Sequence, residues 1–295
     1  MSTIASRNNS PMTHSRRAGV ERSLARLPAP AGPQRLIWKS LLDRIVAAAL
    51  LVPGLPLLGL LMALVRLTSR GPAIYRQQRV GRGGRVFTMY KLRSMRIDAE
   101  TATGPVWSAA GADSRVTPLG WQLRRMHLDE LPQLFNVLRG EMSLVGPRPE
   151  RPEFVVVLAD KIPGYVDRLS VLPGITGLAQ INLPPDTDLD SVRRKLVLDR
   201  EYIERVGPLL DLRIILCTLF RLVGIRGGRG VRLLGLLRTV ALPPTDASRD
   251  GNRNAAAVVP QHDIRLSTEI ERLKSPAHSA ADSVPARETA VVGEA

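Results

Sequence analysis

The sequence predicts an α+β protein that is mainly helical, with one small β-hairpin and an N-terminal apolar segment that enters a membrane. Three observations lead to this prediction. Residues 45–65 form an uncharged apolar run, residues 71–98 alternate loosely around a glycine-rich turn, and residues 189–206 place apolar side chains at helical spacing.

The charge of the chain favours an anionic partner. The 295 residues carry a formal net charge of +15, which suits phosphates, nucleic acid or an anionic membrane face. Aromatic residues make up only 4%, which argues against a protein that binds RNA by base stacking. The single cysteine, Cys217, excludes an internal disulfide, and its apolar neighbours indicate a cysteine that only packs.

Both ends of the chain have the composition of disordered segments. Residues 1–36 are basic and rich in Ser, Pro and Ala, and show no apolar periodicity. Residues 243–295 have a similar character, with a possible short helix near 264–274. We expect a disordered basic arm at the start and a disordered tail at the end.

The apolar run lies within residues 37–70, and its residues alone leave its path open. A straight helix over 45–65 would be about 30 Å long, enough for one membrane span. However, Pro53 and Pro56 sit in its middle and favour a bend. Both flanks are also basic, whereas a spanning helix usually has its Lys and Arg excess on one side. A re-entrant hairpin that returns to the same face is therefore favoured over a straight span or a buried soluble helix.

The middle of the chain contains several short elements. Residues 71–98 predict a β-hairpin with its turn at Gly81, Gly83 and Gly84; the GRGGR turn is not a phosphate-binding P-loop, because no Gly-Lys-Ser/Thr follows. Gly140 is expected to end a helix. We expect helices over 116–127, 130–139, 150–160 and 189–206, and a loop or short strand over 172–185.

Two leucine-rich stretches near the end suit the surface of a membrane. Residues 209–223 are too short and too charged to span, and residues 229–242 combine three arginines with a leucine face. We expect interfacial amphipathic helices here, the second within residues 225–242. Helices that pack in the core or on a partner fit these patterns equally well.

An acid pair, Asp129 and Glu130, stands at the start of the predicted helix over 130–139. A helix start alone explains such a pair, with Asp129 as cap and Glu130 near the positive end of the dipole. The surrounding cations suggest a phosphate site instead, because guanidinium groups near a helix N-terminus bind phosphate. These cations are Lys91, Arg93, Arg124, Arg125 and Arg148, and Pro147 and Pro149 stiffen the last of them.

With a phosphate present, the two acids can have different roles. One carboxylate can attack phosphorus and form an acyl phosphate, and the other can hold Mg²⁺. Other chemistry is poorly supplied: the four histidines are scattered, and no Cys/His cluster has zinc spacing. His127 is either a bystander or a proton relay.

The chain resembles the bacterial sugar transferase family, monotopic polyprenyl-phosphate hexose-1-phosphate transferases. The resemblance runs from about Lys39 to Val223. It rests on ordered blocks: KSLLDR, GPAIYRQQRVGRGGRVFTMYKLRSMRIDAE, LDELPQLFNVLRGEMSLVGPRPE, LPGITGLAQIN, LDREYI and LDLRIIL.

The resemblance implies a reaction. A UDP-hexose would give its sugar 1-phosphate to undecaprenyl or another polyprenyl phosphate, releasing UMP, as the first step of exopolysaccharide or related glycan synthesis. Asp129 would be the nucleophile, and Glu130 would help to bind Mg²⁺. Arg124 and Arg148 match positions that contact phosphates, whereas Arg79, Lys91, Arg93 and Gln180 match family motifs with less defined roles.

The resemblance also implies a location. Residues 71–224 would form a catalytic domain on the cytoplasmic side of the bacterial inner membrane, anchored by a re-entrant hairpin, with other glycan-assembly enzymes as possible partners and no nucleic acid. Two departures stand out: Leu55-Pro56 replaces the common Ser-Pro at the bend, with Pro53 as an extra proline, and GPLL at 207–210 lacks an interfacial aromatic residue. The chain lacks an N-terminal multi-span region, so we expect the short catalytic form.

Two rival functions fit less well. A basic, membrane-anchored nucleic-acid-binding protein would explain the charge but not the acid pair beside KLRSM and GPRPE. A phosphatidyltransferase acting on CDP-alcohols would need a spaced aspartate motif and several spans that this sequence lacks.

Overall fold

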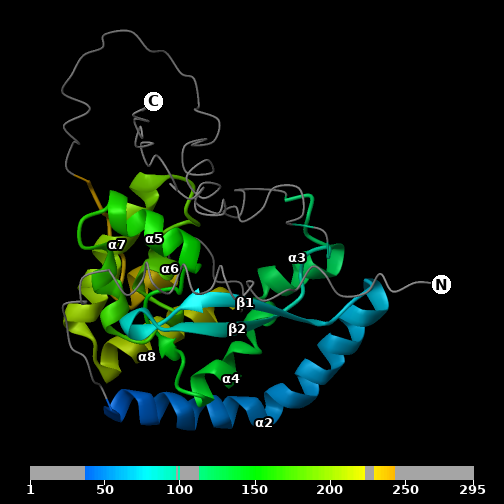
Figure 1. Ribbon diagram of the computed structural model, residues 1–295. Coiled ribbons are helices and arrows are strands. Elements are labelled where there is room, and N and C mark those ends of the chain that lie inside the picture. Colours follow the sequence, from blue (N-terminus) through cyan, green and yellow to red (C-terminus); the bar gives the residue numbers. More distant parts are fainter. Residues whose placement is uncertain (1–36, 98, 100–112, 223–228, 243–295) are drawn as a thin grey trace, which may run out of the picture.

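The computed structural model describes residues 37–97, 99, 113–222 and 229–242 (Figure 1). It is mainly helical, as predicted, and it has two small sheets where one was expected. The expected basic arm, the tail and the possible helix near 264–274 lie outside the described residues. The helices are α2 (Ile37–Thr68), α3 (Pro118–Arg125), α4 (Gln133–Leu138), α5 (Pro152–Lys161), α6 (Leu178–Asn182), α7 (Leu189–Arg205), α8 (Pro208–Leu222) and α9 (Arg229–Leu233). The strands are β1 (Ile74–Val80), β2 (Val86–Leu92), β3 (Ser143–Val145) and β4 (Gly174–Thr176), and the 3₁₀ helices are η1 (Arg82–Gly84), η2 (Leu128–Glu130) and η3 (Tyr165–Ser170).

The apolar run forms one continuous helix, α2, which is longer than the run itself. Pro53 and Pro56 lie inside it, and α2 bends upward toward its C-terminal end in Figure 1. A proline inside a helix removes an amide donor and clashes with a carbonyl four residues back, so a bend is its expected effect. The structure therefore has a single bent helix where we expected two helical arms joined by a turn.

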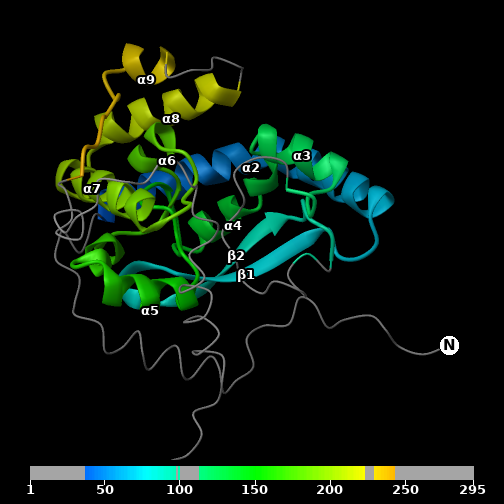
Figure 2. The ribbon, with the colours of Figure 1, turned by 90° about the horizontal axis from the view of Figure 1, so that it is seen from above.

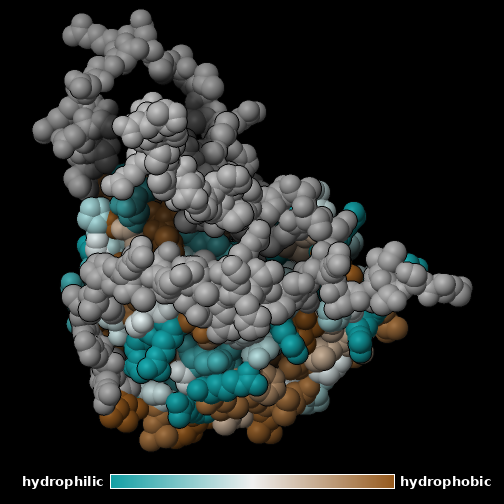
Figure 3. Space-filling model, viewed as in Figure 1, coloured by the Kyte–Doolittle hydropathy of each residue, from teal (hydrophilic) through white to brown (hydrophobic). Residues whose placement is uncertain are grey.

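The elements that follow α2 pack along its whole length. The buried positions of α2 recur every three or four residues: Lys39, Asp43, Ala47, Leu51, Gly54, Leu58, Leu61 and Val65. Its opposite face exposes leucines, and apolar side chains gather along this edge of the molecule (Figure 3). Of the helices in the described ranges, α2 is the one long and apolar enough to cross a membrane.

A buried polar network fixes the N-terminal half of α2. The ammonium of Lys39 lies 2.5 Å from Asp211 Oδ2 on α8, and the hydroxyl of Ser143 donates to Asp43 Oδ2 at 2.6 Å. The hydroxyl of Tyr202 on α7 is 2.8 Å from the other Asp211 oxygen. Buried charges are stable only when paired in this way. The KSLLDR, LDREYI and LDLRIIL blocks therefore meet in one place.

The predicted hairpin is confirmed. β1 and β2 pair antiparallel from Ile74↔Leu92 to Val80↔Val86. Gly83 and Gly84 have φ values of +65° and +77° in the turn, a backbone region that favours glycine. α4 lies between the hairpin and α2, and Figures 1 and 2 show this arrangement from two sides. The hairpin thereby presents Lys91 to the helices that follow.

The sequence did not predict the second sheet. β3 and β4 pair in parallel, with Ser143 opposite Gly174 and Val145 opposite Thr176. A Cβ atom added to Gly174 would lie 2.0 Å from the Gly146 nitrogen, so the two chains approach too closely for a side chain. α6 follows directly, in a stretch that we expected to be loop or short strand.

The C-terminal helices serve both the core and the surface. α8 matches the prediction, but α9 ends at Leu233 and Gly235 (φ +67°) breaks it, so the predicted helix over 229–242 is too long. Cys217 is buried, which confirms a packing cysteine. Leu212 and Leu233 are more than half exposed, so each helix also has an apolar face toward the outside.

Candidate functional site

The eight residues predicted for catalysis or substrate binding line one cavity of about 1550 Å³. Arg125, whose guanidinium lies over the Trp121 ring, and the bend prolines Pro53 and Pro56 are not part of its wall. Its walls come from α2, the hairpin, η2, the loop after β3, α6 and α8. The residues that line it include Arg79, Lys91, Arg93, Arg124, Asp129, Glu130, Arg148 and Gln180. Residues spread over a hundred positions of sequence therefore meet in one place.

The acid pair lies in η2 and does not start a longer helix. α4 begins only at Gln133, with Pro132 at its N-cap, so Asp129 does not cap it. His127 precedes η2 with φ +54°, a left-handed conformation that is uncommon outside glycine, and it turns the chain into η2. This turn directs both carboxylates into the cavity.

Glu130 is held by two cations. Its Oε1 accepts hydrogen bonds from Arg148 Nη2 at 2.6 Å and from Lys91 Nζ at 2.9 Å. Burial alone would raise the pKa of Glu130, but Arg148 and Lys91 outweigh burial and hold that pKa well below its usual range. In return, Glu130 raises the pKa of the Arg148 guanidinium. Glu130 is therefore a permanent anion that fixes the Arg148 side chain.

Asp129 has a different environment. Its carboxylate is buried, yet no residue in the described ranges donates a hydrogen bond to it. Burial raises the pKa of Asp129; the charge of Lys91 opposes this shift and that of Glu130 adds to it. A carboxylate without hydrogen bonds keeps its lone pairs available, which those of Glu130 Oε1 are not.

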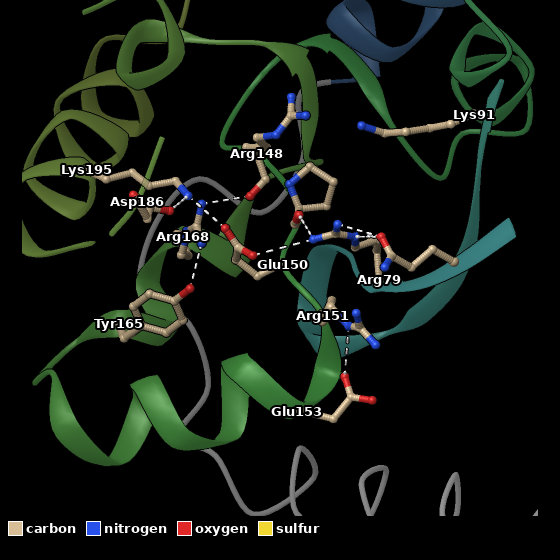
Figure 4. A network of polar contacts seen from close by, with 12 residues as sticks. Arg79, Lys91, Arg148, Glu150, Arg151, Glu153, Tyr165, Arg168, Asp186 and Lys195 are labelled. Carbon is tan, nitrogen blue, oxygen red and sulfur yellow. Dashed lines mark hydrogen bonds and ion pairs between the residues drawn. The ribbon is translucent and has the colours of Figure 1, made fainter. Parts of the chain in front are cut away.

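The loop that carries Arg148 is rigid. Proline at 147 and 149 restricts the backbone, and four successive carbonyl oxygens, from residue 147 to residue 150, each accept a hydrogen bond from a different segment. The donors are Gly174 N (2.9 Å), Arg168 Nη2 (2.8 Å), Arg79 Nη1 (3.0 Å) and Val80 N (2.9 Å), in that order. Figure 4 shows the bonds from Arg168 and Arg79. The direction of Arg148 is consequently set before any ligand binds.

The other predicted residues lie on the cavity wall with structural contacts of their own. Arg79 also bonds Gln77 Oε1, and burial lowers the pKa of Arg79 to about 10. Arg93 donates to the carbonyl and hydroxyl of Ser69, just after α2. The remaining contacts are Arg124 Nε to Ser94 Oγ (2.8 Å) and Gln180 Nε2 to Ile175 O (3.2 Å).

Sequence reasoning missed an ion-pair cluster at one end of the cavity. Lys195 on α7 lies 2.7 Å from Glu150 Oε1 and 2.5 Å from Asp186 Oδ2. Glu150 closes the GPRPE block, so its position in that block was a usable signal. Nothing in the helical pattern around Lys195 distinguished it from a surface lysine.

A second part of the cavity is apolar and reaches α2. Val46 and Leu50 line it from α2, and Ile215 and Leu219 line it from α8. The acid pair thus lies in a space with both cationic and apolar walls. Such a space suits a ligand with phosphate groups and a hydrocarbon portion.

The acid pair can contribute to a Mg²⁺ site but cannot complete one. Within the described part of the chain, no three His, Cys, Asp or Glu side chains cluster as metal ligands. Mg²⁺ is commonly held by one or two carboxylates together with substrate phosphates and water. The Asp129 carboxylate and Glu130 Oε2 receive no hydrogen bond from the residues described, so they fit that role.

Comparison with known proteins gives a consistent result. The model of the family described as bacterial sugar transferase matches residues 34–224. A UDP-glucose:undecaprenyl-phosphate glucose-1-phosphate transferase from Xanthomonas campestris pv. campestris is 41% identical over 191 residues, covering 64% of this chain and 39% of the relative. An enzyme of the same name from Caulobacter vibrioides is 43% identical over 183 residues, covering 61% and 67% of the two chains.

A third relative carries a different sugar in its name. The UDP-N-acetylgalactosamine-undecaprenyl-phosphate N-acetylgalactosaminephosphotransferase of Aeromonas hydrophila is 42% identical over 176 residues, covering 59% of this chain and 41% of the relative. The match therefore spans less than half of the Xanthomonas and Aeromonas proteins.

The two carboxylates should titrate far apart. We expect Asp129 to titrate above the ordinary aspartate pKa of about 3.9, because burial and Glu130 both disfavour its charged form. Glu130→Gln should lower the pKa of Asp129, since it removes a negative charge and leaves Lys91 and Arg148 in place. The measurement is ¹³C NMR of protein labelled at the aspartate carboxyl, with Asp129→Asn to assign the signal. A pKa below 3.9 in the unsubstituted protein, or no decrease in Glu130→Gln, would contradict this description.

Proposed function

This chain belongs to the bacterial sugar transferase family, and on that basis we propose that it transfers a hexose 1-phosphate from a UDP-sugar to undecaprenyl phosphate and releases UMP. The observation that carries the proposal is Asp129, a buried carboxylate without hydrogen bonds from the described residues, in a cavity with cationic and apolar walls. The cations suit the diphosphate of the UDP-sugar, and the apolar wall suits the polyprenyl chain. Relatives act on UDP-glucose and on UDP-N-acetylgalactosamine by name, so the sugar itself stays open.

The proposed reaction has two displacements at the same phosphorus atom. In the first, an Asp129 oxygen attacks the phosphorus that carries the sugar; the bond to the UMP oxygen breaks and UMP leaves with that electron pair. In the second, an oxygen of undecaprenyl phosphate attacks the same phosphorus, and the bond to Asp129 breaks. The product is an undecaprenyl diphosphate sugar, and Asp129 is a carboxylate again. No proton needs to move when the acceptor phosphate is a dianion.

The residues around Asp129 have roles that follow from their contacts. Phosphoryl transfer depends mainly on positioning and on neutralising negative charge. Arg148, whose direction is fixed by Glu130 and by the rigid loop, binds the transferring phosphate. Lys91 bonds the same Glu130 oxygen as Arg148, and its positive charge reduces the repulsion that a phosphate meets near Asp129. Mg²⁺, held by Glu130 Oε2 with the substrate phosphates, would supply further neutralisation.

We also propose that the protein is monotopic in the inner membrane, with its catalytic domain on the cytoplasmic side. Buried positions occur in both halves of α2, from Lys39 to Val65, so the same domain covers both halves. A helix crossing the bilayer would carry one half away from that domain and into lipid. A bent helix with its leucine face in the membrane keeps both halves in contact with the domain and returns to the face it entered.

Asp129→Asn should lower UMP release on the order of a thousandfold or more, because an amide is too weak a nucleophile to form the acyl phosphate. UDP-sugar binding, measured by calorimetry, should persist. Asp190→Asn, an exposed position on α7, is the matched control and should keep its activity. Substantial UMP release by purified Asp129→Asn would refute the assignment of the nucleophile.

Glu130→Gln should raise the Mg²⁺ concentration needed for half-maximal rate by about tenfold, since it removes a charged oxygen ligand. The rate is measured as UMP release across a Mg²⁺ titration. Glu204→Gln, at an exposed position of α7, controls for the loss of one negative charge. Identical titrations for Glu130→Gln and the control would rule out Glu130 as a metal ligand.

The membrane arrangement is tested with single cysteines in a Cys217→Ala background. A cysteine at position 30 and another at position 205, which is well exposed on α7, are probed with an impermeant thiol reagent. Both should be protected in intact cells and labelled after permeabilisation, because both lie on the cytoplasmic side. Labelling of position 30 in intact cells, with position 205 protected, would show a straight span.

A further inference from the structure

Arg168, in η3, is a buried cation that does not line the cavity. It is 4% exposed, and its partner Asp199 on α7 is 2% exposed. Neither residue belongs to the cavity wall, so neither can touch a substrate there. A buried ion pair of this kind often contributes little net stability, because the desolvation of both charges offsets their attraction. This suggests another role for Arg168.

The contacts of Arg168 point toward the acid pair. Its Nε and Nη2 lie 3.0 and 2.9 Å from Asp199 Oδ2, and its Nη1 donates to the Tyr165 hydroxyl at 2.7 Å. The second hydrogen of Nη2 goes to the carbonyl oxygen of Arg148, at 2.8 Å (Figure 4). A continuous line of hydrogen bonds therefore runs from α7 through Arg168 to the backbone of the residue that holds Glu130.

We propose that Arg168, oriented by Asp199, is a positioning residue that fixes Arg148 for catalysis. This inference rests on the proposed transferase function. The adjacent carbonyls of the loop are held by backbone amides or by Arg79, whereas the Arg148 carbonyl, among the described residues, is held by Arg168 alone. Without that bond, the peptide plane of Arg148 can rotate, and its guanidinium moves relative to Asp129. A displacement of about 1 Å at a catalytic group can cost about a hundredfold in rate.

Only a guanidinium can make this set of contacts. Its planar fork directs separate N–H groups to Asp199, to Tyr165 and to the Arg148 carbonyl at once. A lysine ammonium could keep the ion pair with Asp199, and so preserve the fold, but it is a single centre on a flexible stem. Arg168→Lys therefore separates the positioning role from the structural role.

The chain offers a matched control in the same two elements. Arg200 on α7 pairs with Asp167 of η3 at 2.8 Å, and its side chain is 41% exposed. Arg200→Lys makes the same chemical change in an ion pair that also joins α7 to η3. Within the described part of the chain, Arg200 bonds only to residues 163, 164 and 167, and so does not reach the loop that carries Arg148.

The experiment measures UMP release, melting temperature and UDP-sugar dependence for the wild type, Arg168→Lys and Arg200→Lys. Arg168→Lys should lower kcat by about 10- to 100-fold with little change in KM, because Arg148 acts mainly on the transition state. Arg200→Lys should keep kcat within about twofold. In an Arg148→Lys background, Arg168→Lys should lower kcat by less than about threefold further, since the group that it positions is already altered.

Each other outcome has a definite meaning. A kcat of Arg168→Lys equal to that of Arg200→Lys would overturn the positioning role. The positioning role would also be overturned if Arg168→Lys lowered kcat by the same factor in the wild type and in the Arg148→Lys background. A general structural defect, unlike a positioning defect, would act equally in both. If Arg168→Lys does not fold, the double variant Arg168→Met/Asp199→Leu replaces it, because this variant removes both buried charges together. Its kcat is compared with that of Arg200→Lys, and an equal kcat would overturn the positioning role. No UMP release by the wild type would overturn the proposed function, and the inference with it.

Discussion

The site depends on one buried carboxylate, Glu130, and on the two cations that neutralise it. A buried anion is costly unless it is paired and hydrogen-bonded, so Lys91 and Arg148 must both be in place for η2 to fold as it does. Lys91 comes from the hairpin and Arg148 from the loop after β3, so this requirement ties three distant segments together. Because both cations bond Glu130, the neighbouring Asp129 is left without a hydrogen-bonding partner in the described part of the chain.

The different surroundings of the two adjacent acids explain why Arg148 needs to be rigid. Arg148 bonds Glu130, and on the proposed mechanism it also binds the substrate phosphate, so its position must suit both anions. Its backbone is restricted by two prolines and by hydrogen bonds to four consecutive carbonyls. Electrostatic stabilisation is most effective when it needs no reorganisation during the reaction. The rigidity of the loop is consistent with that requirement.

Local patterns in the sequence predicted much of this structure. Alternation and turn glycines located the hairpin, and helical spacing located α7. The predicted helix over 116–127 contains α3. The acid pair and its cations were found because they cluster around two short blocks. Each of the eight side chains predicted for the site lines the cavity, although their catalytic and binding roles are still predictions.

The features that were missed depend on contacts between distant segments. β3 and β4 have three residues each, which is too short for an alternating apolar pattern to be recognised in the sequence. The two strands can pair because Gly146 and Gly174 allow their backbones to approach closely. α2 stays continuous through two prolines because the domain packs on both sides of the bend, which composition does not reveal. Arg168 was not singled out, since nothing local in the sequence indicates a bond to a carbonyl 20 residues away.

The most direct test of the central account is intact and peptide mass spectrometry of the protein mixed with UDP-sugar and no lipid acceptor. The account predicts an added hexose phosphate on the peptide that contains Asp129, lost when undecaprenyl phosphate is supplied. UMP release that requires the lipid acceptor, with no modified peptide at any time, would contradict it.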